Sequence, residues 1–565
     1  MRPVPIGVDD FRVVREQGME YVDKSRLIQE VIDQGAQAIL LPRPRRFGKT
    51  LNLSMLRCFF EKRGEDLSGL FEGLYIDSAG ERYRAHFQRY PVIHLTFKGA
   101  KHERFEDCLG AIRLKIRVLF DEHRFVLDSG RLSEREAHAY RAVLEDTAEP
   151  ALYSRALLDL SSYLHRVHGQ KVVLLIDEYD EPIYAGHVHG YAPAILGVLH
   201  AVLTEGLKDN PHLYKAVVTG ILRIARESIF SGLNNLAVYS LLRRPFNAAF
   251  GFTEEEVHAL LKRSNADDNI DAVRRWYNGY VFGKTVVYNP WSILNYIADE
   301  ERLLRPHWLS TSSNDLIRKE LQQHAFRIQE AIEALLQGGS IERALDEHVA
   351  LGDLEKREGA LWSLLVFSGY LKAEPAEGIP GEEPPYRLSI PNREVRQIYT
   401  STFREWMEEQ LSRRGGDIRR LTKALFTGDA EVLEEQLQAF TANVLSYHDI
   451  ALRPEQVYHA FVIGLLAALE PTYLVRSNRE SGEGRPDVLI LPQTTGKPGA
   501  VLELKVARAG KKTPEQALAE GVAQIRGGNY GAELSAAGAS PVHAFAVAFD
   551  GKRVWVKQAD LSAEA

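Results

Sequence analysis

The chain has 565 residues, of which 45% are hydrophobic and 26% are charged, and its formal net charge is −7. The composition is ordinary for a soluble globular protein, and the length exceeds what one hydrophobic core supports, so we expect roughly two to four domains. The negative balance excludes a protein that is basic throughout, so any nucleic-acid binding would need a local basic surface.

The sequence favours a reducing, non-membrane environment. Its most apolar run, 461–469, is far shorter than the ~20 residues that span a bilayer. The N-terminus lacks the basic start and apolar run of a signal peptide. The two cysteines, Cys58 and Cys108, stand apart from any CxxC motif, so neither a disulfide scaffold nor a cysteine zinc site is expected. We predict a cytoplasmic protein without a membrane partner.

Strands and helices alternate in the first half of the chain. Apolar runs typical of strands lie at 37–41, 91–97, 171–177 and 215–220, and helical patterns lie at 104–122, 151–168 and 193–208. Strands that are apolar on both faces and separated by helices are typical of a parallel sheet covered on both sides. The sequence therefore predicts an α/β domain built on such a sheet.

A helical region follows. Thr253 and Glu256 form a capping-box pattern that predicts a helix start, and helical patterns dominate to about residue 445. Within this region, a helical pattern at 359–373, an acidic loop at 374–385 and a short strand resemble a winged-helix module.

The last segment returns to alternating elements. They are a helix at 454–469, strands at 486–491 and 499–507, a helix at 514–526, and a hairpin that turns at Asp550–Gly551. We predict three domains: an α/β domain that includes a helical lid (1–305), a helical or winged-helix-like domain (306–445) and a second α/β domain (446–565).

A phosphate-binding loop is predicted at RRFGKT, residues 45–50. This stretch follows a predicted strand and opens a helix, where backbone N–H groups and the helix N-terminus can meet phosphate oxygens. Lys49 would reach the β- and γ-phosphates, and Thr50 would ligate Mg²⁺. Arg43 occupies the position of the first glycine in GxxxxGK[ST], so the pattern supports nucleotide binding more directly than hydrolysis.

The stretch KVVLLIDEYDE, residues 171–181, supplies the second half of such a site. Asp177, at the end of an apolar strand, would hold the Mg²⁺ shell, and Glu178 would polarise the attacking water. The alternative is an ordinary loop whose acids cap a helix. Because the two motifs follow separate strands in the usual order, we predict that ATP and Mg²⁺ bind here.

Longer stretches resemble a known family. GVDDF, YVDKS, LLPRPRRFGKTLNLSML, VVLLIDEYDEPI, VVTGILRIARESIFSGLNNL, WYNGYVFG and VYNPWSIL look like the bacterial AAA-ATPase-like proteins that carry a C-terminal PD-(D/E)XK nuclease domain. The resemblance covers nearly the whole chain. It implies a P-loop AAA-like ATPase followed by a restriction-endonuclease-like α/β domain. RPRRFGKT is this family's form of the phosphate loop, so Arg43 is a family trait.

The resemblance also implies which residues bind the nucleotide. They are Arg46, Phe47, Gly48, Lys49, Thr50, Asp177 and Arg223. Thr219 would end the sensor-1 strand, and Arg223 or Arg226 would follow it as a phosphate sensor. The alternative for these two arginines is a solvated helix face.

In PD-(D/E)XK nucleases, one strand presents an Asp and the next presents (D/E)xK, which Asp487, Glu503 and Lys505 match. The strand period of two puts Glu503 and Lys505 on the same face. Two carboxylates make a hard oxygen site for Mg²⁺, with Mn²⁺ as a substitute. Lys505 would orient or deprotonate a water, or stabilise charge on the phosphorane. The alternative is an edge strand with an exposed Glu–Lys pair.

Neighbouring residues extend this match. Arg485 precedes Asp487 as in the family's GRxD signature, and Gln524 with Tyr530 resembles the QxxxxxY element that follows the core. Glu455 matches the helical acid that many members add to the metal site. The alternative for Glu455 is a first-turn acid that the helix dipole stabilises.

The sequence thus predicts an ATP-regulated, Mg²⁺-dependent nuclease of the bacterial cytoplasm, with DNA as the expected nucleic acid. One alternative is a nucleotide-dependent signalling or DNA-binding module whose nuclease fold does not cut, and another is an NTPase with a scaffold tail. ATPases of this type often assemble, so a homo-oligomer is compatible with the sequence. His187 and His189 are spaced like metal ligands, but nothing nearby completes a set, and we predict that they lie in a loop.

Overall fold

The computed structural model forms two compact units. The N-terminal unit comprises Met1–Ile317 and Glu342–Val395, and the C-terminal unit comprises Arg318–Ile341 and Arg396–Ala565. The division into three domains at residues 305 and 445 stays a prediction. The structure describes residues 2–221, 235–308, 320, 328, 331–332, 334–336, 338–348, 354, 357–377, 384–412, 418–444, 462, 466, 469, 472–477, 486–507, 512–528 and 530–560.

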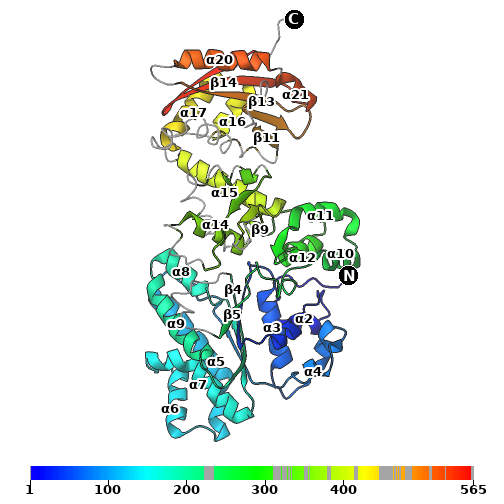
Figure 1. The fold of residues 1–565 in the computed structure, drawn as a ribbon, viewed down its shortest axis with the longest axis vertical. Coiled ribbons are helices and arrows are strands. Elements are labelled where there is room, and N and C mark those ends of the chain that lie inside the picture. The colour runs from blue at the N-terminus through cyan, green and yellow to red at the C-terminus, as the bar shows by residue number, and fades with distance from the viewer. Residues whose placement is uncertain are drawn as a thin grey trace. The chain divides into compact units, whose positions relative to one another are not determined.

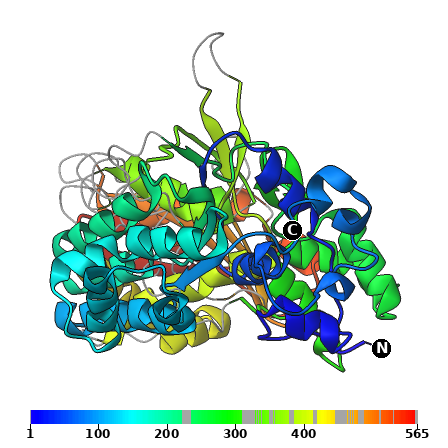
Figure 2. The ribbon, with the colours of Figure 1, turned by 90° about the horizontal axis from the view of Figure 1, so that it is seen from below.

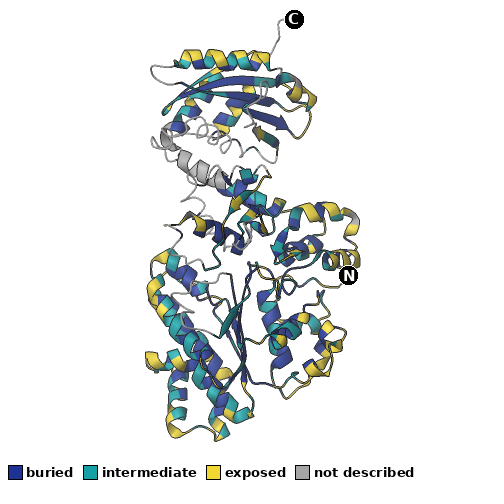
Figure 3. Ribbon diagram, viewed as in Figure 1, coloured by how far each residue is buried: buried dark blue, intermediate teal, exposed yellow. Residues whose placement is uncertain are grey.

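A five-stranded parallel sheet forms the centre of the N-terminal unit (Figure 1). Its strands lie in the order β2 (Val92–Thr96), β3 (Val172–Asp177), β4 (Leu213–Gly220), β1 (Ala38–Pro42) and β5 (Leu236–Val238). Every residue of β1 and β3 is buried, as the dark blue strands of Figure 3 show. Layers on both faces explain why β1 and the first five residues of β3 are apolar, and the predicted parallel sheet is confirmed. The edge strand β5 is only partly buried and has three residues, which is too short a run to give a strand signal in the sequence.

Helices cover both faces of this sheet. They are α1 (Phe11–Glu16), α2 (Arg26–Asp33), α3 (Lys49–Phe60), α4 (Glu81–Arg84), α5 (Phe105–Glu122), α6 (Glu134–Leu144), α7 (Pro150–His168), α8 (Glu181–His189) and α9 (Ala192–Leu207). Figures 1 and 2 show α6, α7 and α9, in cyan and teal, on one side of the sheet, and the blue α2 and α3 on the other.

The predicted loop around His187 and His189 is wrong, because both residues lie in the last turn of helix α8. The helix has Pro182 in its first turn and ends at Gly190, which has a left-handed backbone (φ 83°). A proline at the start and a glycine past the end are helix signals. They outweigh the loop character that the glycines of this stretch suggest.

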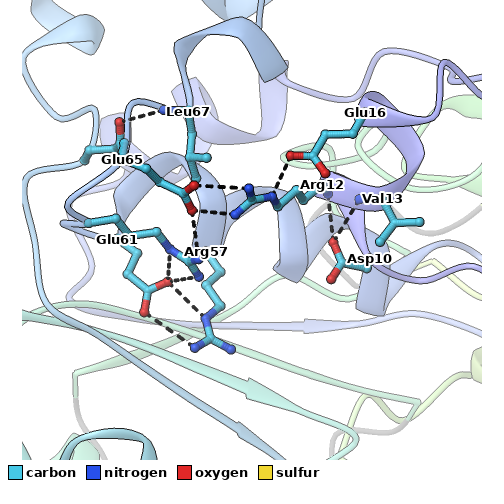
Figure 4. A network of polar contacts seen from close by, with 10 residues as sticks. Asp10, Arg12, Val13, Glu16, Arg57, Glu61, Glu65 and Leu67 are labelled. Atoms are coloured by element: carbon cyan, nitrogen blue, oxygen red, sulfur yellow. Dashed lines mark hydrogen bonds and ion pairs between the residues drawn. The ribbon is translucent and has the colours of Figure 1, made fainter.

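An exposed ion-pair network links α1 to the segment that follows α3 (Figure 4). The Arg12 guanidinium donates to Glu16 and to both carboxylate oxygens of Glu65, and Arg57 Nε donates to Glu61 Oε2 at 3.2 Å. Exposed pairs of this kind contribute about 0–1 kcal/mol each. The network therefore contributes less to the stability of the fold than the burial of the apolar residues of α3 does.

Residues 253–298 form a helical lid. It contains α10 (Glu254–Arg263), α11 (Ile270–Tyr277), a hairpin of β6 (Tyr280–Phe282) and β7 (Thr285–Val287), and α12 (Pro290–Ala298). The predicted capping box is confirmed, since Thr253 and Glu256 exchange side-chain bonds with each other's backbone. Val257, Leu260 and Ile293 of this segment belong to an apolar cluster that also includes Val22 of the N-terminal segment.

The segment 341–395 contains the predicted helix and the predicted strand, and residues 378–383 of the predicted loop lie outside the described residues. The elements are β8 (Ile341–Arg343), α14 (Glu358–Phe367), β9 (Lys372–Pro375) and β10 (Tyr386–Ser389), with the strands in the order β8–β10–β9. Helix α14 stops at Phe367, before the end of the predicted helical pattern. Gly369 follows with a left-handed backbone (φ 87°), which ends a helix at little steric cost. The winged-helix resemblance stays a prediction.

A second sheet forms the centre of the C-terminal unit. Its order is β11 (Tyr473–Ser477), β12 (Val488–Pro492), β13 (Gly499–Val506), β14 (Val542–Asp550) and β15 (Arg553–Ala559), and only β13 and β14 pair in parallel. The predicted hairpin turn is one residue early. Asp550 pairs with Arg553, so the loop is Gly551–Lys552, and Gly551 (φ 58°) supplies the left-handed backbone of a two-residue turn.

The two faces of this sheet pack against different helices. The helices of the unit are α15 (Arg393–Ser412), α16 (Ile418–Thr427), α17 (Ala430–Val444), α20 (Pro514–Gly527) and α21 (Tyr530–Ala536). Leu502 and Phe545 pack toward α16 and α17, while Val501 and Ala544 pack toward α20 and α21. The predicted helix at 454–469 lies largely outside the described residues. Within the described part of the chain, no helix has the length and apolar character that a membrane crossing requires.

Candidate functional site

The phosphate loop connects the end of β1 to the start of α3. Gly48 stands at the helix N-cap with a left-handed backbone (φ 81°), a conformation that glycine adopts without steric cost. Arg46 also has a left-handed backbone (φ 67°), which is strained for a residue with a side chain. Phe47 is buried and packs its ring 5.0 Å from Tyr280 and 5.2 Å from Phe282, measured between ring centroids. The loop is therefore anchored to the lid hairpin.

Lys49 is buried and its amine points back into the loop. Nζ donates to the carbonyl oxygens of Arg43 at 3.0 Å and Pro44 at 2.9 Å. Burial lowers the pKa of Lys49, and the carboxylates of Glu178 and Asp177 oppose that effect. Phosphate oxygens would offer the ammonium charged acceptors, which bind more strongly than neutral carbonyls.

Arg43 has a structural position, although it replaces the first glycine of the motif. Its guanidinium is fully buried and donates to the carbonyls of Pro42 (2.8 Å), Tyr239 (2.7 Å) and Phe246 (3.1 Å). It also lies over the ring of Phe250, 5.2 Å from the centroid. Burial lowers the pKa of Arg43 to about 9. The side chain therefore joins three backbone segments beneath the loop.

Asp177 lies at the end of β3 and connects the two halves of the predicted nucleotide site. Its carboxylate accepts from Thr50 Oγ1 at 2.6 Å and from Thr219 Oγ1 at 2.5 Å. The strand order β3–β4–β1 explains the geometry, because Thr219 lies near the end of β4, between the other two strands. Mg²⁺ prefers such carboxylate and hydroxyl oxygens, so these residues fit the predicted ion.

Glu178 and Glu181 form an acidic pair beside the loop. Glu178 has φ 51°, a left-handed conformation that costs a non-glycine residue about 1–3 kcal/mol. Glu181 Oε2 accepts from the backbone N–H of Gly99 at 2.9 Å. Burial, and then the Glu178 carboxylate, raise the pKa of Glu181 to about 7. Sequence reasoning missed Glu181, although the repeated acids of DEYDE signal a second carboxylate one helical turn later.

Loop residues 45–50, Glu178 and Glu181 line a cavity of about 390 Å³, and Asp177 is not one of its lining residues. One part of its wall is polar and contains Arg45, Arg46, Lys49, Thr50, Glu178 and Glu181. Another part is apolar and comes from the N-terminal segment and the lid, with Val8, Val22, Phe252, Leu260 and Leu294. Figures 1 and 2 both show the green lid helices beside the blue N-terminal segment. A polar end beside an apolar wall suits a ligand with a phosphate chain and an aromatic base. The sequence carries no local pattern for the apolar wall.

In the C-terminal sheet, β12 and β13 bring Asp487 beside Glu503. The registered pair Val488–Leu502 lies next to both residues, and Asp487 Oδ2 accepts from the backbone N–H of Leu504 at 2.8 Å. Asp487 is partly buried, whereas Glu503 is fully buried. The hairpin therefore holds the two carboxyl groups on the side of the sheet that α20 covers.

Glu503 has the features of a cation ligand. Its Oε1 accepts from Lys505 Nζ at 2.8 Å, while its buried Oε2 receives no hydrogen bond from the described residues. Burial, and then the carboxylate of Asp487, raise the pKa of Glu503 to about 7. A buried carboxylate oxygen without a donor is costly, and a divalent cation shared with Asp487 would satisfy it.

Lys505 is held from two sides. Its Nζ donates to Glu503 and, at 2.7 Å, to Gln524 Oε1 on helix α20. The helix can approach this closely because Gly521 has no side chain: a Cβ there would lie 2.9 Å from Ala546 Cβ. Tyr530, at the start of α21, is buried, and burial followed by the charge of Glu503 raises its pKa.

Two family models match the chain. Residues 5–230 match the family described as predicted AAA-ATPase, and residues 453–559 match the PD-(D/E)XK nuclease superfamily. Both matches are to the kinds of domain that the sequence resembles. A relative in Azotobacter chroococcum mcd 1, named uncharacterized protein in vnfD 5′ region, is 28% identical over 499 residues and is matched over 87% of each chain.

Several predicted residues of the two domains lie outside the described residues. In the AAA-ATPase domain these are Arg223 and Arg226, and in the nuclease-superfamily domain they are Glu455 and Arg485. Within the described ranges, no cluster of three or more His, Cys, Asp or Glu side chains is placed to hold a metal ion. The candidate metal site therefore rests on two carboxylates among the described residues, and the third ligand expected from Glu455 stays a prediction.

Proposed function

We propose that the protein is a metal-dependent nuclease whose activity responds to ATP, with DNA as the nucleic acid that it cuts. The observation that supports this most strongly is the buried Glu503 Oε2, which has no donor among the described residues while Oε1 accepts from Lys505 and the Asp487 carboxylate raises the pKa of Glu503. An ion pair formed only for stability would satisfy both carboxylate oxygens, because breaking or half-satisfying a buried charge is destabilising.

Asp487 and Glu503 would hold Mg²⁺, or Mn²⁺ in its place, because both ions prefer hard oxygen ligands. The bound ion would supply Lewis-acid stabilisation of the scissile phosphate and a more acidic water. Lys505 would contribute a fixed positive charge beside that phosphate. Burial opposes the charge, but the bond to Glu503 and the carboxylate of Asp487 raise the pKa of Lys505. We therefore favour an electrostatic role for Lys505 over that of a general base.

ATP with Mg²⁺ would bind in the N-terminal cavity. Lys49 would exchange its loop carbonyls for phosphate oxygens, Thr50 and Asp177 would hold the ion, and Glu178 would orient the attacking water. The apolar wall would receive the base. We also propose the bacterial cytoplasm as the compartment and a homo-oligomer as an assembly that completes the ATPase site.

Plasmid cleavage tests the proposal. Supercoiled and single-stranded DNA would be incubated with Mg²⁺ or Mn²⁺, with and without ATP, for the wild type, Lys505→Ala and Lys49→Ala. We expect cleavage to be absent in Lys505→Ala, and the effect of ATP to be absent in Lys49→Ala. If ATP is hydrolysed but neither DNA is cut by the wild type, a signalling or DNA-binding module with a non-cutting nuclease fold becomes the better interpretation.

A further inference from the structure

Arg46 of the phosphate loop contacts the lid directly. Its guanidinium carbon lies 4.1 Å from the centroid of the Trp291 ring, and both residues line the cavity. Trp291 is in the first turn of α12, which also contributes Pro290 and Leu294 to the cavity wall. A phosphate that enters the loop would compete for the guanidinium, because a charge-assisted bond to phosphate is stronger than a cation–π contact. The position of α12 is therefore sensitive to what occupies the loop.

Hydrogen bonds fix the first turn of α12, which contains both Trp291 and Ser292. Asn289 Oδ1 accepts from the backbone N–H groups of Trp291 (2.9 Å) and Ser292 (3.4 Å). Ser292 Oγ in turn donates to Glu394 Oε2 at 2.7 Å. Trp291, whose ring contacts Arg46 of the phosphate loop, and Ser292, whose hydroxyl donates to Glu394, are therefore consecutive residues.

Glu394 lies in the first turn of α15, yet its carboxylate does not cap that helix. Asn392 performs the capping, with Oδ1 accepting from the N–H of Val395 at 3.0 Å. Glu394 is fully buried, and its other oxygen, Oε1, accepts from the backbone N–H of Trp308 at 2.8 Å. A buried carboxylate is costly where apolar packing alone would hold two helices. The two hydrogen bonds that Glu394 accepts instead connect three parts of the chain: α12, the segment that ends at Trp308, and α15.

Helix α15 leads from one unit into the other. The N-terminal unit ends at Val395 and the C-terminal unit resumes at Arg396, both within Arg393–Ser412. We propose that Trp291, Ser292 and Glu394 form a relay, which passes a change of the phosphate loop through α12 to the first turn of α15 and so to the nuclease unit. The relay rests on the proposed function and specifies how ATP regulates the nuclease.

Ser292→Ala tests the relay, because it removes the bond to Glu394 and leaves the cavity wall intact. Glu394→Gln is the second variant: its amide oxygen can still accept from the N–H of Trp308, but its NH2 group replaces the oxygen that accepts from Ser292 Oγ and cannot accept that bond. Ser161→Ala is the matched control: Ser161 is an equally buried serine on α7, and its hydroxyl bonds Leu157 O at 2.6 Å. For each full-length variant, ATP affinity, ATP turnover, nucleotide-free DNA cleavage and ATP-dependent cleavage are measured separately.

We expect Ser292→Ala and Glu394→Gln to keep ATP affinity, turnover and nucleotide-free cleavage within about twofold of the wild type, and to lose the ATP-dependent change in cleavage. Ser161→Ala should keep that change. Hydrogen exchange gives a readout without cleavage: ATP should alter protection at 290–298 in all variants, but at 393–402 only in the wild type and the control. A full ATP response in Ser292→Ala overturns the relay alone. A wild type in which ATP does not alter cleavage overturns the proposed function together with the relay.

Discussion

Lys505 Nζ donates to Gln524 Oε1 at 2.7 Å, and this bond joins strand β13 to helix α20. The same amine donates to Glu503 Oε1 at 2.8 Å. The two acceptors come from different elements, so the ammonium has a fixed direction only while both are present. The position of the Lys505 charge in the candidate metal site therefore depends on a neutral amide.

Gln524→Ala should reduce metal-dependent cleavage about 10- to 100-fold, the usual effect of removing a group that orients a ligand or charge at a metal site. The Lys505 amine would keep its hydrogen bond to Glu503 but lose the bond to Gln524 that fixes its direction. Plasmid cleavage at saturating Mg²⁺ measures the effect. Glu515→Gln, at an exposed position of the same helix, should leave the rate unchanged. An unchanged rate in Gln524→Ala would show that Glu503 alone positions Lys505.

Gly521→Ala should lower both stability and cleavage. The added Cβ would lie 2.9 Å from Ala546 Cβ and 3.6 Å from Lys505 Cγ, so α20 must shift away from β14 and carry Gln524 with it. Overpacking of this kind costs about 1–3 kcal/mol. Thermal unfolding and the cleavage rate are the measurements. Gly527→Ala is the control, because a Cβ there meets no atom within 4 Å, and its helix propensity favours the variant by up to about 1 kcal/mol.

Arg43→Gly restores the first glycine of the phosphate-loop pattern and should nevertheless destabilise the protein by about 3–5 kcal/mol. The variant would remove a buried guanidinium and leave the carbonyls of Tyr239 and Phe246 without this donor. We expect a lower unfolding midpoint and no gain in ATP affinity, measured by denaturant unfolding and by titration with ATP. Equal stability together with tighter ATP binding would show that the arginine restricts the loop instead of supporting it.

The sequence predicts the elements whose signals are local. Periodicity and spacing within one short stretch predict the buried strands β1 and β3, the Thr253–Glu256 capping box and the (D/E)xK strand. The two domain families follow from motifs of the same kind. Each of these signals can be interpreted without knowing which distant segment packs against it.

Long-range contacts could not be predicted in this way. The place of Arg43 depends on Tyr239 and Phe246, which are about two hundred residues away in the sequence. The apolar wall of the cavity combines Val8 with Leu294, and no periodicity connects them. Glu394 resembles an ordinary first-turn acid in the sequence, which the helix dipole would stabilise at the surface. Only the fold shows that its carboxylate is buried against Ser292.

Glu394 also makes stability depend on pH. Burial, opposed by the bonds from Trp308 and Ser292, raises the pKa of its carboxyl to about 7 in the folded protein, against roughly 4.3 in an unfolded chain. The folded state therefore binds the proton more tightly. The stabilisation is fully present below the unfolded pKa, and it is lost as pH rises through about 7. The shift corresponds to at most about 4 kcal/mol.

Denaturant unfolding of the wild type and Glu394→Gln at matched pH values from 5 to 8 measures this contribution. The variant cannot titrate at this position, so the free energy of unfolding of the wild type, minus that of the variant, should fall by up to about 3 kcal/mol across the range. Glu181 and Glu503, whose pKa values are also raised to about 7, are present in both proteins and cancel in the difference. A difference that stays constant with pH would mean that Glu394 keeps its charge when it is buried, held by the hydrogen bonds from Ser292 and Trp308.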